Sequence, residues 1–523
     1  MAVLAPPRLR HEPDDDTTVR PSSRLIPLAA LTVAFALSRV AFYLAGIRFD
    51  GSVLDGTKTT DMYQLVDVHL LRDQLITSVW HLESQPPLFN LFSGLILKLP
   101  HGLQVPAEAG SFLALGLILV LATYLLLEEL GVPRWVAVVA TLVLVVVAPS
   151  FVLFENWWNY AYPTAALLTL SALLLLRYLR RRQWGYGLAF FAVVSVVVLL
   201  NSTYQIEWLA VVVLLAVIVV RKQWRHGLMV AAIPVLVVGA WYIKDAAMFG
   251  TASTSSWLGM NLARDVLYKA PRTQIAALEK NGTLTPLAGL PPFQNPNTYV
   301  PRFVKPGHTG TPALDQLYKA DGSANFNNPL YASLSSQYLH DDLAFIAAHP
   351  GEYETDVNIS VRNWFTATDQ NFTPVANWHL IKGYTQIYDQ SVEWQPRTAP
   401  AVAFVAFFAH KPPALGTLSY QAIIMYGLTL IGLPILFWRR RKDDPAVAGA
   451  LAFLWFTVGY AFVVSSLIEV GENERFRFEL GTLPVVGGIV VLAAICRALS
   501  AWARSRPGAP AAGAGASDAD WAP

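Results

Sequence analysis

The sequence is built largely from long, uninterrupted apolar segments. A helix needs roughly 20 apolar residues to cross the hydrocarbon core of a bilayer. Windows of this kind occur ten times, at about residues 25–47, 110–130, 134–154, 160–179, 185–203, 207–221, 227–248, 413–438, 446–467 and 479–497. Only 14% of the residues are charged, whereas a soluble domain has about 25%. The sequence therefore predicts an all-α polytopic membrane protein with about ten transmembrane helices, and it excludes a soluble enzyme and a disordered chain.

Lys and Arg residues lie beside alternate apolar windows, and short loops rich in these residues stay on the cytoplasmic side of a membrane. They precede the first window and follow the fourth, sixth, eighth and tenth, at Arg8, Arg10, Arg20, Arg24, Arg177, Arg180, Arg181, Arg182, Arg221, Lys222, Arg225, Arg439, Arg440, Arg441, Lys442, Arg497, Arg504 and Arg506. With ten spans, all these ends share one side. We therefore expect a plasma-membrane protein with both termini cytoplasmic, in which residues 1–24 and 498–523 form disordered tails.

This orientation places two long segments outside the cell. Residues 48–109 form the first outer loop of a seven-span module at 25–248, and residues 249–412 form an exoplasmic insertion of mixed fold before a three-span module at 413–497. No nucleotide-binding motif occurs in the short cytoplasmic loops. The net charge of +2 does not indicate nucleic-acid binding, and a single cysteine, Cys496, excludes an internal disulfide framework. Any chemistry is therefore expected on the outer face.

Charged residues next to the outer ends of the apolar windows are the main candidates for that chemistry. Asp50 lies two or three residues beyond the apolar end of the first window. The turn at 469–479 contains Arg475 and Arg477, and guanidinium groups bind phosphate oxygens in a bidentate manner. The alternative is that both arginines form salt bridges with the acidic residues of the same turn, Glu472, Glu474 and Glu479.

Three further features have both a functional and a structural interpretation. Arg39 lies inside the first span, where an ionisable side chain is costly and suggests function, although it can also snorkel or pair with a carboxylate. Lys244 either binds an anion or pairs with Asp245. The segment Glu155–Tyr160, which includes Trp157 and Trp158, fits a sugar-stacking platform or an interfacial aromatic belt.

Several of these features together resemble the GT-C superfamily of membrane glycosyltransferases, which use polyprenyl-phosphate sugars. The similarity lies in Arg48-Phe49-Asp50 after the first span, the Gln85-Pro86-Pro87-Leu88 turn, the large insertion after span seven, and the Glu472–Arg477 turn. The protein O-mannosyltransferase and aminoarabinose-transferase branch is the most similar. The sequence departs from that pattern where Gly51 replaces the second residue of an Asp-Glu pair and where Gln85 replaces a His.

The resemblance implies an inverting transfer of a sugar from a polyprenyl-phosphate donor to a hydroxyl of a carbohydrate, protein or lipid acceptor. It implies that Asp50 is the general base, with Asp55, Asp61 and Asp67 as alternatives. A carboxylate that removes the hydroxyl proton accelerates such a step by roughly 10²–10⁴-fold. Two sets of further residues follow: Arg475, Arg477, Arg39 and Lys244 for the donor phosphate, and Gln85, Glu155, Trp157, Trp158 and Asn473 for the acceptor or sugar.

Metal dependence stays open at this stage. His81 and Glu83 stand near enough in sequence to join Asp50 around a divalent cation with oxygen ligands, but no dense ligand motif occurs. Two other functions also remain. A flippase or exporter of lipid-linked sugars would carry charged, broken helices near the midplane, and a non-catalytic cell-envelope assembly protein would tolerate the loss of Asp50.

Overall fold

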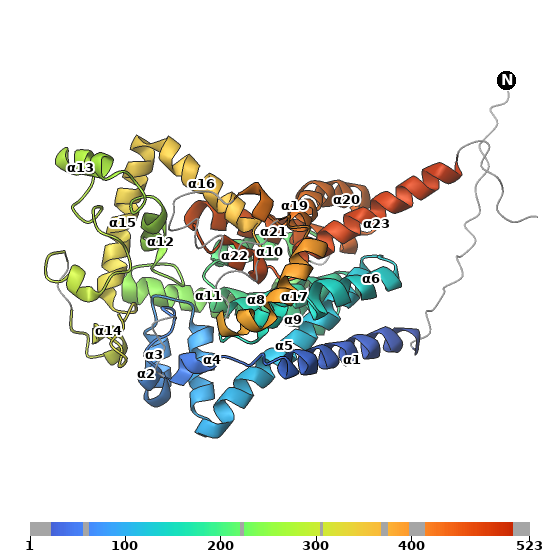
Figure 1. The fold of residues 1–523 in the computed structure, drawn as a ribbon, viewed down its shortest axis with the longest axis horizontal. Helices are drawn as coiled ribbons and strands as arrows, with labels where there is room; N and C mark the ends of the chain where they lie inside the picture. Colours follow the sequence, from blue (N-terminus) through green and yellow to red (C-terminus); the bar gives the residue numbers. More distant parts are fainter. Residues whose placement is uncertain are drawn as a thin grey trace, which may run out of the picture.

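Helices form most of the described part of the chain, and turns, bends and short irregular segments connect them. The computed structural model describes residues 22–55, 62–219, 224–303, 307–367, 375–396 and 414–505. Within these ranges no strand forms, and the only β-type pairings are isolated bridges between Asp50 and Trp157, Tyr318 and Ala324, and Thr366 and Leu418. Figure 1 shows a long bundle with a group of shorter helices at one end. The predicted all-helical membrane class is confirmed.

Seven helices in the described ranges are long and apolar enough to cross a membrane. They are α1 (Ser22–Leu44), α5 (His101–Glu129), α8 (Ala161–Arg181), α11 (Trp224–Phe249), the helix Tyr420–Arg440 that comprises α19 and α20, α21 (Pro445–Ile468) and α23 (Leu483–Arg504). The other apolar helices α9 (Trp184–Leu200) and α10 (Ile206–Val219) have 17 and 14 residues. Every predicted window is thus helical, but the count of ten spans stays a prediction.

An eighth candidate span is broken. Helices α6 (Arg134–Thr141) and α7 (Pro149–Glu155) meet at an angle of 53° across the π-helical turn Leu142–Val146. Pro149 starts α7, and a proline has no N–H to continue the hydrogen bonds of the preceding helix. A π turn and a proline are two of the established causes of sharp helix kinks. The break therefore leaves backbone carbonyls open to neighbouring side chains.

Ion pairs collect at the end of the bundle that the sequence assigns to the cytoplasm. Arg134 and Arg24 approach Glu128 near the end of α5, at 2.9 and 3.6 Å. Arg177 and Arg180 at the end of α8 approach the adjacent Glu129, at 2.9 and 3.7 Å. These contacts bring the start of α1, the end of α5, the start of α6 and the end of α8 together, as the predicted alternation of spans requires. Which side of the membrane this end faces stays a prediction.

The insertion forms a helical cap at the opposite end (Figure 1). It contains α12 (Leu258–Asp265), α13 (Arg272–Lys280), α14 (Pro312–Asp315), α15 (Pro329–Ala348) and α16 (Pro350–Trp364). Met260, Tyr331, Leu334 and Tyr338 belong to a hydrophobic core separate from that of the bundle. We expected a mixed fold here, and the described residues instead form helices, turns and isolated bridges.

Helix α17 (Val375–Ser391) belongs to the bundle rather than to this cap. The hydroxyl of Tyr388 donates to the carbonyl of Val143 at 2.9 Å, and Tyr384 donates to the carbonyl of Val147 at 2.5 Å. The side-chain amide of Asn377 donates to the carbonyl of Arg48 at 2.7 Å. The carbonyls exposed by the broken span thus become acceptors for α17, which returns the end of the insertion to the membrane helices.

Asp342 in α15 provides a test of the cap. Its carboxylate is buried, and neither oxygen accepts a hydrogen bond within the described residues. Burial, followed by the charges of Asp265 and Asp341, raises the pKa of Asp342 to about 9. Because the folded pKa lies above the unfolded one, the native state binds the extra proton, and stability falls as the pH rises from about 4 to about 9.

We expect Asp342→Asn to raise the free energy of unfolding at alkaline pH by about 1–3 kcal/mol, because the amide carries no charge to bury. Thermal unfolding followed by tryptophan fluorescence across this pH range measures the effect. The neighbouring Asp341 is the control, since it accepts hydrogen bonds from Thr285 at 2.6 and 3.2 Å and its change to Asn destabilises the fold. Equal stability losses at every pH for Asp342→Asn would contradict the assignment.

Candidate functional site

Asp50 is held against the turn between α7 and α8. Its backbone N–H donates to the carbonyl of Asn156 at 2.9 Å, and the two segments form a parallel bridge at Trp157. One carboxylate oxygen, Oδ1, accepts from the N–H and the hydroxyl of Ser52 at 3.1 and 2.6 Å. The other oxygen accepts no hydrogen bond from a described residue, and the side chain is half-buried. This is a fixed carboxylate with one oxygen available for a proton.

The alternative carboxylates differ from Asp50 in their surroundings. Asp55 ends the 3₁₀ turn Ser52–Asp55 and is exposed. Asp61 lies outside the described residues. Asp67 is buried at the start of α2 (Val68–Asp73), where it accepts from the N–H groups of His69 and Ala320. Both oxygens of Asp67 are therefore used to cap a helix and to attach the insertion.

Arg39 and Glu155, predicted to bind phosphate and acceptor respectively, bind each other. The guanidinium donates to both carboxylate oxygens of Glu155 at 2.8 Å, in a bidentate pair. The hydroxyl of Tyr162 also donates to Glu155 at 2.6 Å. The sequence left open that Arg39 pairs with a carboxylate, and this is the arrangement found. The pair joins α1 to the end of α7.

Lys244 likewise takes the structural alternative. Its ammonium forms an ion pair with Asp245 at 2.5 Å and donates to the carbonyl of Trp80 at 3.0 Å. The ring centroid of Trp241 lies 3.9 Å from the same nitrogen. These contacts attach the C-terminal end of α11 to α3 (Leu75–Trp80). Gln85 is buried close by in the first loop, with no side-chain hydrogen bond to a described residue.

The aromatic and amide candidates for the acceptor or sugar site also differ, because some are engaged within the fold and others stay accessible. Trp158 is fully buried, stacks on Phe92 at 5.1 Å and donates to Ser93, so it is a core residue. Trp157 is half-buried and keeps one side accessible. The side-chain amide of Asn473 forms a hydrogen bond within its own turn, where it donates to the carbonyl of Glu469 at 2.7 Å.

Arg475 is neutralised inside the short helix α22 (Asn473–Glu479). It donates to Glu472 at 2.9 Å, to Glu479 at 2.7 Å and to the hydroxyl of Tyr160 at 3.1 Å. Burial raises the pKa of Glu479 to about 7, against the opposing charge of Arg475. All three guanidinium nitrogens of Arg475 are thus engaged with protein groups.

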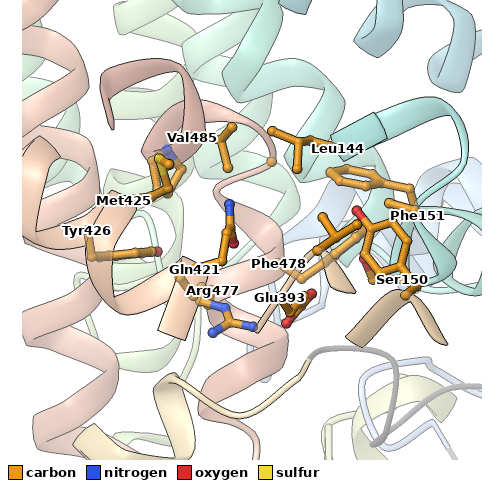
Figure 2. Close-up of a pocket in the computed structure, with 16 residues that line it drawn as sticks. Leu144, Ser150, Phe151, Glu393, Gln421, Met425, Tyr426, Arg477, Phe478 and Val485 are labelled. Carbon is orange, nitrogen blue, oxygen red and sulfur yellow. The ribbon is translucent and has the colours of Figure 1, made fainter. Parts of the chain in front are cut away.

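Arg477, two residues later, is different. Its Nη2 donates to the carbonyl of Thr366 at 2.7 Å, while Nη1 has no hydrogen-bond partner within the described residues. The side chain is only 8% exposed. Figure 2 shows the guanidinium in a cavity of about 90 Å³, together with Glu393 and Gln421. A buried cation that lacks a partner for one nitrogen is available to an anion.

The cavity is polar around Arg477 and apolar beyond it. Glu393, Gln421, Tyr426 and Ser150 contribute polar groups. Burial raises the pKa of Glu393, and the charge of Arg477 opposes that rise. Glu393 was missed by sequence reasoning, because it lies in the insertion, just after α17, and no local pattern connects it to a residue 84 positions away.

A second cavity of about 20 Å³ adjoins the first and is almost entirely apolar. The two share Leu144, Phe151, Gly481 and Val485. The second is also lined by Leu127, Ala140, Val145 and Ile489, which places it between α5, the broken span and α23. The polar end at Arg477 therefore continues into a gap among membrane-crossing helices.

An aromatic contact path connects this cavity with Asp50. Trp157, which pairs with Asp50 through the backbone, packs edge-on against Phe154 at 5.7 Å between ring centroids. Phe154 stacks on Phe478 at 4.0 Å, next to Arg477 in α22. The turn after α7 thus touches both the candidate base and the helix that bears the free guanidinium.

A divalent cation finds no ready site in the part of the chain that the structure describes. There, no group of three or more His, Cys, Asp or Glu side chains is arranged to hold a metal ion. The ring of His81 interacts with the carbonyl of Thr77 at 2.8 Å instead of meeting Asp50.

Comparison with known proteins identifies no family. No protein-family model and no curated protein matches the sequence. Two solved structures from Archaeoglobus fulgidus match at a low level. The apo oligosaccharyltransferase has 14% identity and a TM-score of 0.35 over 93% of this chain, and the oligosaccharyltransferase AglB with an inhibitory peptide and a dolichol-phosphate has 13% and 0.34 over 92%. The match covers 52% of each archaeal chain, so this chain spans about half their length. These values are too low to establish a shared fold.

The Arg39–Glu155 pair leads to a prediction that distinguishes a structural role of Arg39 from phosphate binding. We expect Arg39→Ala to lower the free energy of unfolding by about 3–5 kcal/mol, because Glu155 is left as an uncompensated buried charge. The double variant Arg39→Met/Glu155→Gln is expected to recover more than half of this loss. Thermal unfolding of the purified protein in detergent provides the measurement. A normal melting temperature for Arg39→Ala would contradict the structural role and favour phosphate binding.

Proposed function

We propose that the protein transfers a sugar, with inversion, from a polyprenyl-phosphate donor to an acceptor hydroxyl at the outer surface of the membrane. The single observation that carries this proposal is the cavity in which Arg477 presents an unpaired guanidinium nitrogen next to an apolar gap. The acceptor is a carbohydrate, protein or lipid hydroxyl, and the donor is the proposed lipid partner.

The charge of Arg477 supports an anionic ligand. A buried cation without a full set of partners is costly, and a phosphate would complete it with charge-assisted hydrogen bonds. Arg477 retains one bond to the carbonyl of Thr366, which orients the guanidinium plane. Its remaining N–H groups are then directed towards the cavity rather than free to rotate. The planar fork matches phosphate oxygens better than a lysine would.

The adjoining apolar gap supports a lipid tail on that anion. Leu127, Val145 and Ile489 line the gap within the bundle, where a water-soluble phosphate would make no favourable contacts. The π turn Leu142–Val146 contributes Leu144 to both cavities. At about 20 Å³ the gap has room for about one small group, and its apolar lining favours the first hydrocarbon unit beside a phosphate head over the polar groups of a free nucleotide sugar.

Asp50 supports group transfer rather than binding alone. In the proposed step the acceptor oxygen attacks the anomeric carbon, and its proton passes to the free oxygen of Asp50. The bond between the anomeric carbon and the phosphate oxygen breaks, and its electron pair leaves with the phosphate. Arg477 stabilises the charge that develops on that phosphate. A single displacement of this kind inverts the anomeric configuration.

The first test is transfer by the purified protein in lipid nanodiscs, with a panel of radiolabelled polyprenyl-phosphate sugars. We expect Asp50→Asn to lower kcat at least about 10²-fold while donor affinity is retained. We expect Arg477→Ala to weaken donor binding by about 10- to 100-fold, because it removes a charged hydrogen bond. Arg497→Ala, at the other end of the bundle, is the matched control, since the side-chain hydrogen bond of Arg497 within the described residues goes to the carbonyl of Gly131.

Two results would refute the proposal. One is wild-type protein that binds donors but moves them across the bilayer without transfer, which is the behaviour of a flippase. The other is full activity in Arg477→Ala, which would place the phosphate elsewhere. Absence of both binding and turnover would favour the non-catalytic assembly protein.

Glu393 adds a pH dependence to donor binding. Burial raises the pKa of its carboxyl, so protons leave it only as the pH rises above the usual range for Glu. The resulting negative charge repels the donor phosphate beside Arg477. We therefore expect donor affinity to fall as the pH rises through the raised pKa of Glu393, above the usual range for a Glu carboxyl, and Glu393→Gln to abolish this fall. Equilibrium binding of a radiolabelled donor as a function of pH provides the measurement, and an unchanged pH profile in Glu393→Gln would be the contrary result.

A further inference from the structure

Glu108 on α5 is a buried carboxyl that lies against the loop carrying Asp50. Its side chain is 1% exposed, and Oε2 has no hydrogen-bond partner within the described residues. A β-carbon added to Gly51 would lie 2.4 Å from this oxygen. The carboxyl of Glu108 therefore occupies the space beside Gly51, directly after Asp50 in the chain, and only a glycine leaves room for it there.

Three carboxyl groups share this corner of the molecule. The charges of Asp55 and Asp50 both act on Glu108, and no positively charged side chain of the described residues is among the groups that do. Burying a carboxyl among two others without a compensating cation is costly. The three differ in exposure: Glu108 is buried, Asp50 is half-buried and Asp55 is exposed.

The order of these groups suggests a route for a proton. In the proposed reaction Asp50 gains the proton of the acceptor hydroxyl and has to lose it before the next turnover. Ser52 occupies Oδ1 of Asp50 with two hydrogen bonds, so the proton resides on the other oxygen. The free oxygen of Glu108 lies beside Gly51, which follows Asp50 in the chain, and the short turn Ser52–Asp55 that ends in the exposed Asp55 begins at the next residue.

We propose that Glu108 is a positioning residue that accepts the proton from Asp50 and passes it through Asp55 to water. This inference rests on the proposed glycosyl transfer. The balance is complete: the O–H bond of the acceptor breaks, an O–H bond forms on Asp50, and the same proton then moves to Glu108, to Asp55 and to a water molecule. Asp50 returns to the carboxylate form, and no oxidant or further reactant is needed.

Glu108→Gln is the primary test, because glutamine keeps the shape of the side chain over Gly51 but accepts no proton. We expect kcat to fall about 10- to 100-fold and the KM of donor and acceptor to stay within about twofold. Formate, a small diffusible base, is expected to restore at least about a tenth of the wild-type kcat at saturating concentration. The pH profile of kcat is expected to shift in the variant, since solvent bases replace the internal carboxyl.

Two variants near Glu108 act as controls. Gly51→Ala displaces the Glu108 carboxyl without altering any titratable group, and it is expected to lower kcat as Glu108→Gln does. Val105→Ala trims a second side chain beside Gly51, whose Cγ2 would lie 3.1 Å from a β-carbon added there, and is expected to leave kcat unchanged. Together, these two variants distinguish an effect of the position of the Glu108 carboxyl on kcat from an effect of loop packing.

The outcomes are distinguishable from failure of the proposed function. If the wild-type protein transfers no sugar from any donor, the proposed function fails first. If the wild type is active and Glu108→Gln keeps full kcat, the proton route alone is refuted. A loss of kcat with a lowered melting temperature and no response to formate would also refute it, because Glu108 would then act only in packing.

Discussion

The ion pair between Arg39 and Glu155 joins α1 to the end of α7, next to the turn that holds Asp50. Inside a membrane, a single buried charge is expensive, and two opposite charges in bidentate contact are tolerated. Here the pair fixes the end of α7 to α1, and Tyr162 adds a third bond from α8. The next two residues in the chain, Asn156 and Trp157, then form the support on which Asp50 is held. The contacts of the pair thus connect it to Asp50 through the backbone of this turn.

The break between α6 and α7 also shapes the candidate site. A continuous helix would satisfy its own carbonyls and fill the space beside α23. The π turn and Pro149 instead expose the carbonyls of Val143 and Val147, which α17 uses as acceptors. The same irregular turn supplies Leu144 to both cavities. The irregular turn thus provides hydrogen-bond acceptors for α17 and forms part of the wall of both cavities.

The cap is connected to the bundle by charge as well as by packing. Arg264 in α12 forms an ion pair with Glu469, and it lies 3.8 Å from Glu472. Glu472 in turn binds Arg475 at 2.8 Å. A chain of alternating charges therefore runs from the cap to α22, the helix that also carries Arg477. Because each link has a partner, α22 is held rigidly while Arg477 remains the arginine of that helix with a free nitrogen in the described structure.

Local patterns determined which segments become helices and which ends carry positive charge, because apolar windows and basic loops act over a few residues at a time. They also placed Asp50 next to the outer end of the first window, where the resemblance to the GT-C superfamily implies a general base. Only the tertiary structure decided which charges are free. Arg475 and Arg477 are two positions apart on α22 and so point in nearly opposite directions; one meets two glutamates and the other meets a cavity. Glu393 and Glu108 come from distant segments, and no periodicity in the sequence brings them to the site, because pairings over such separations are set by packing and not by local pattern.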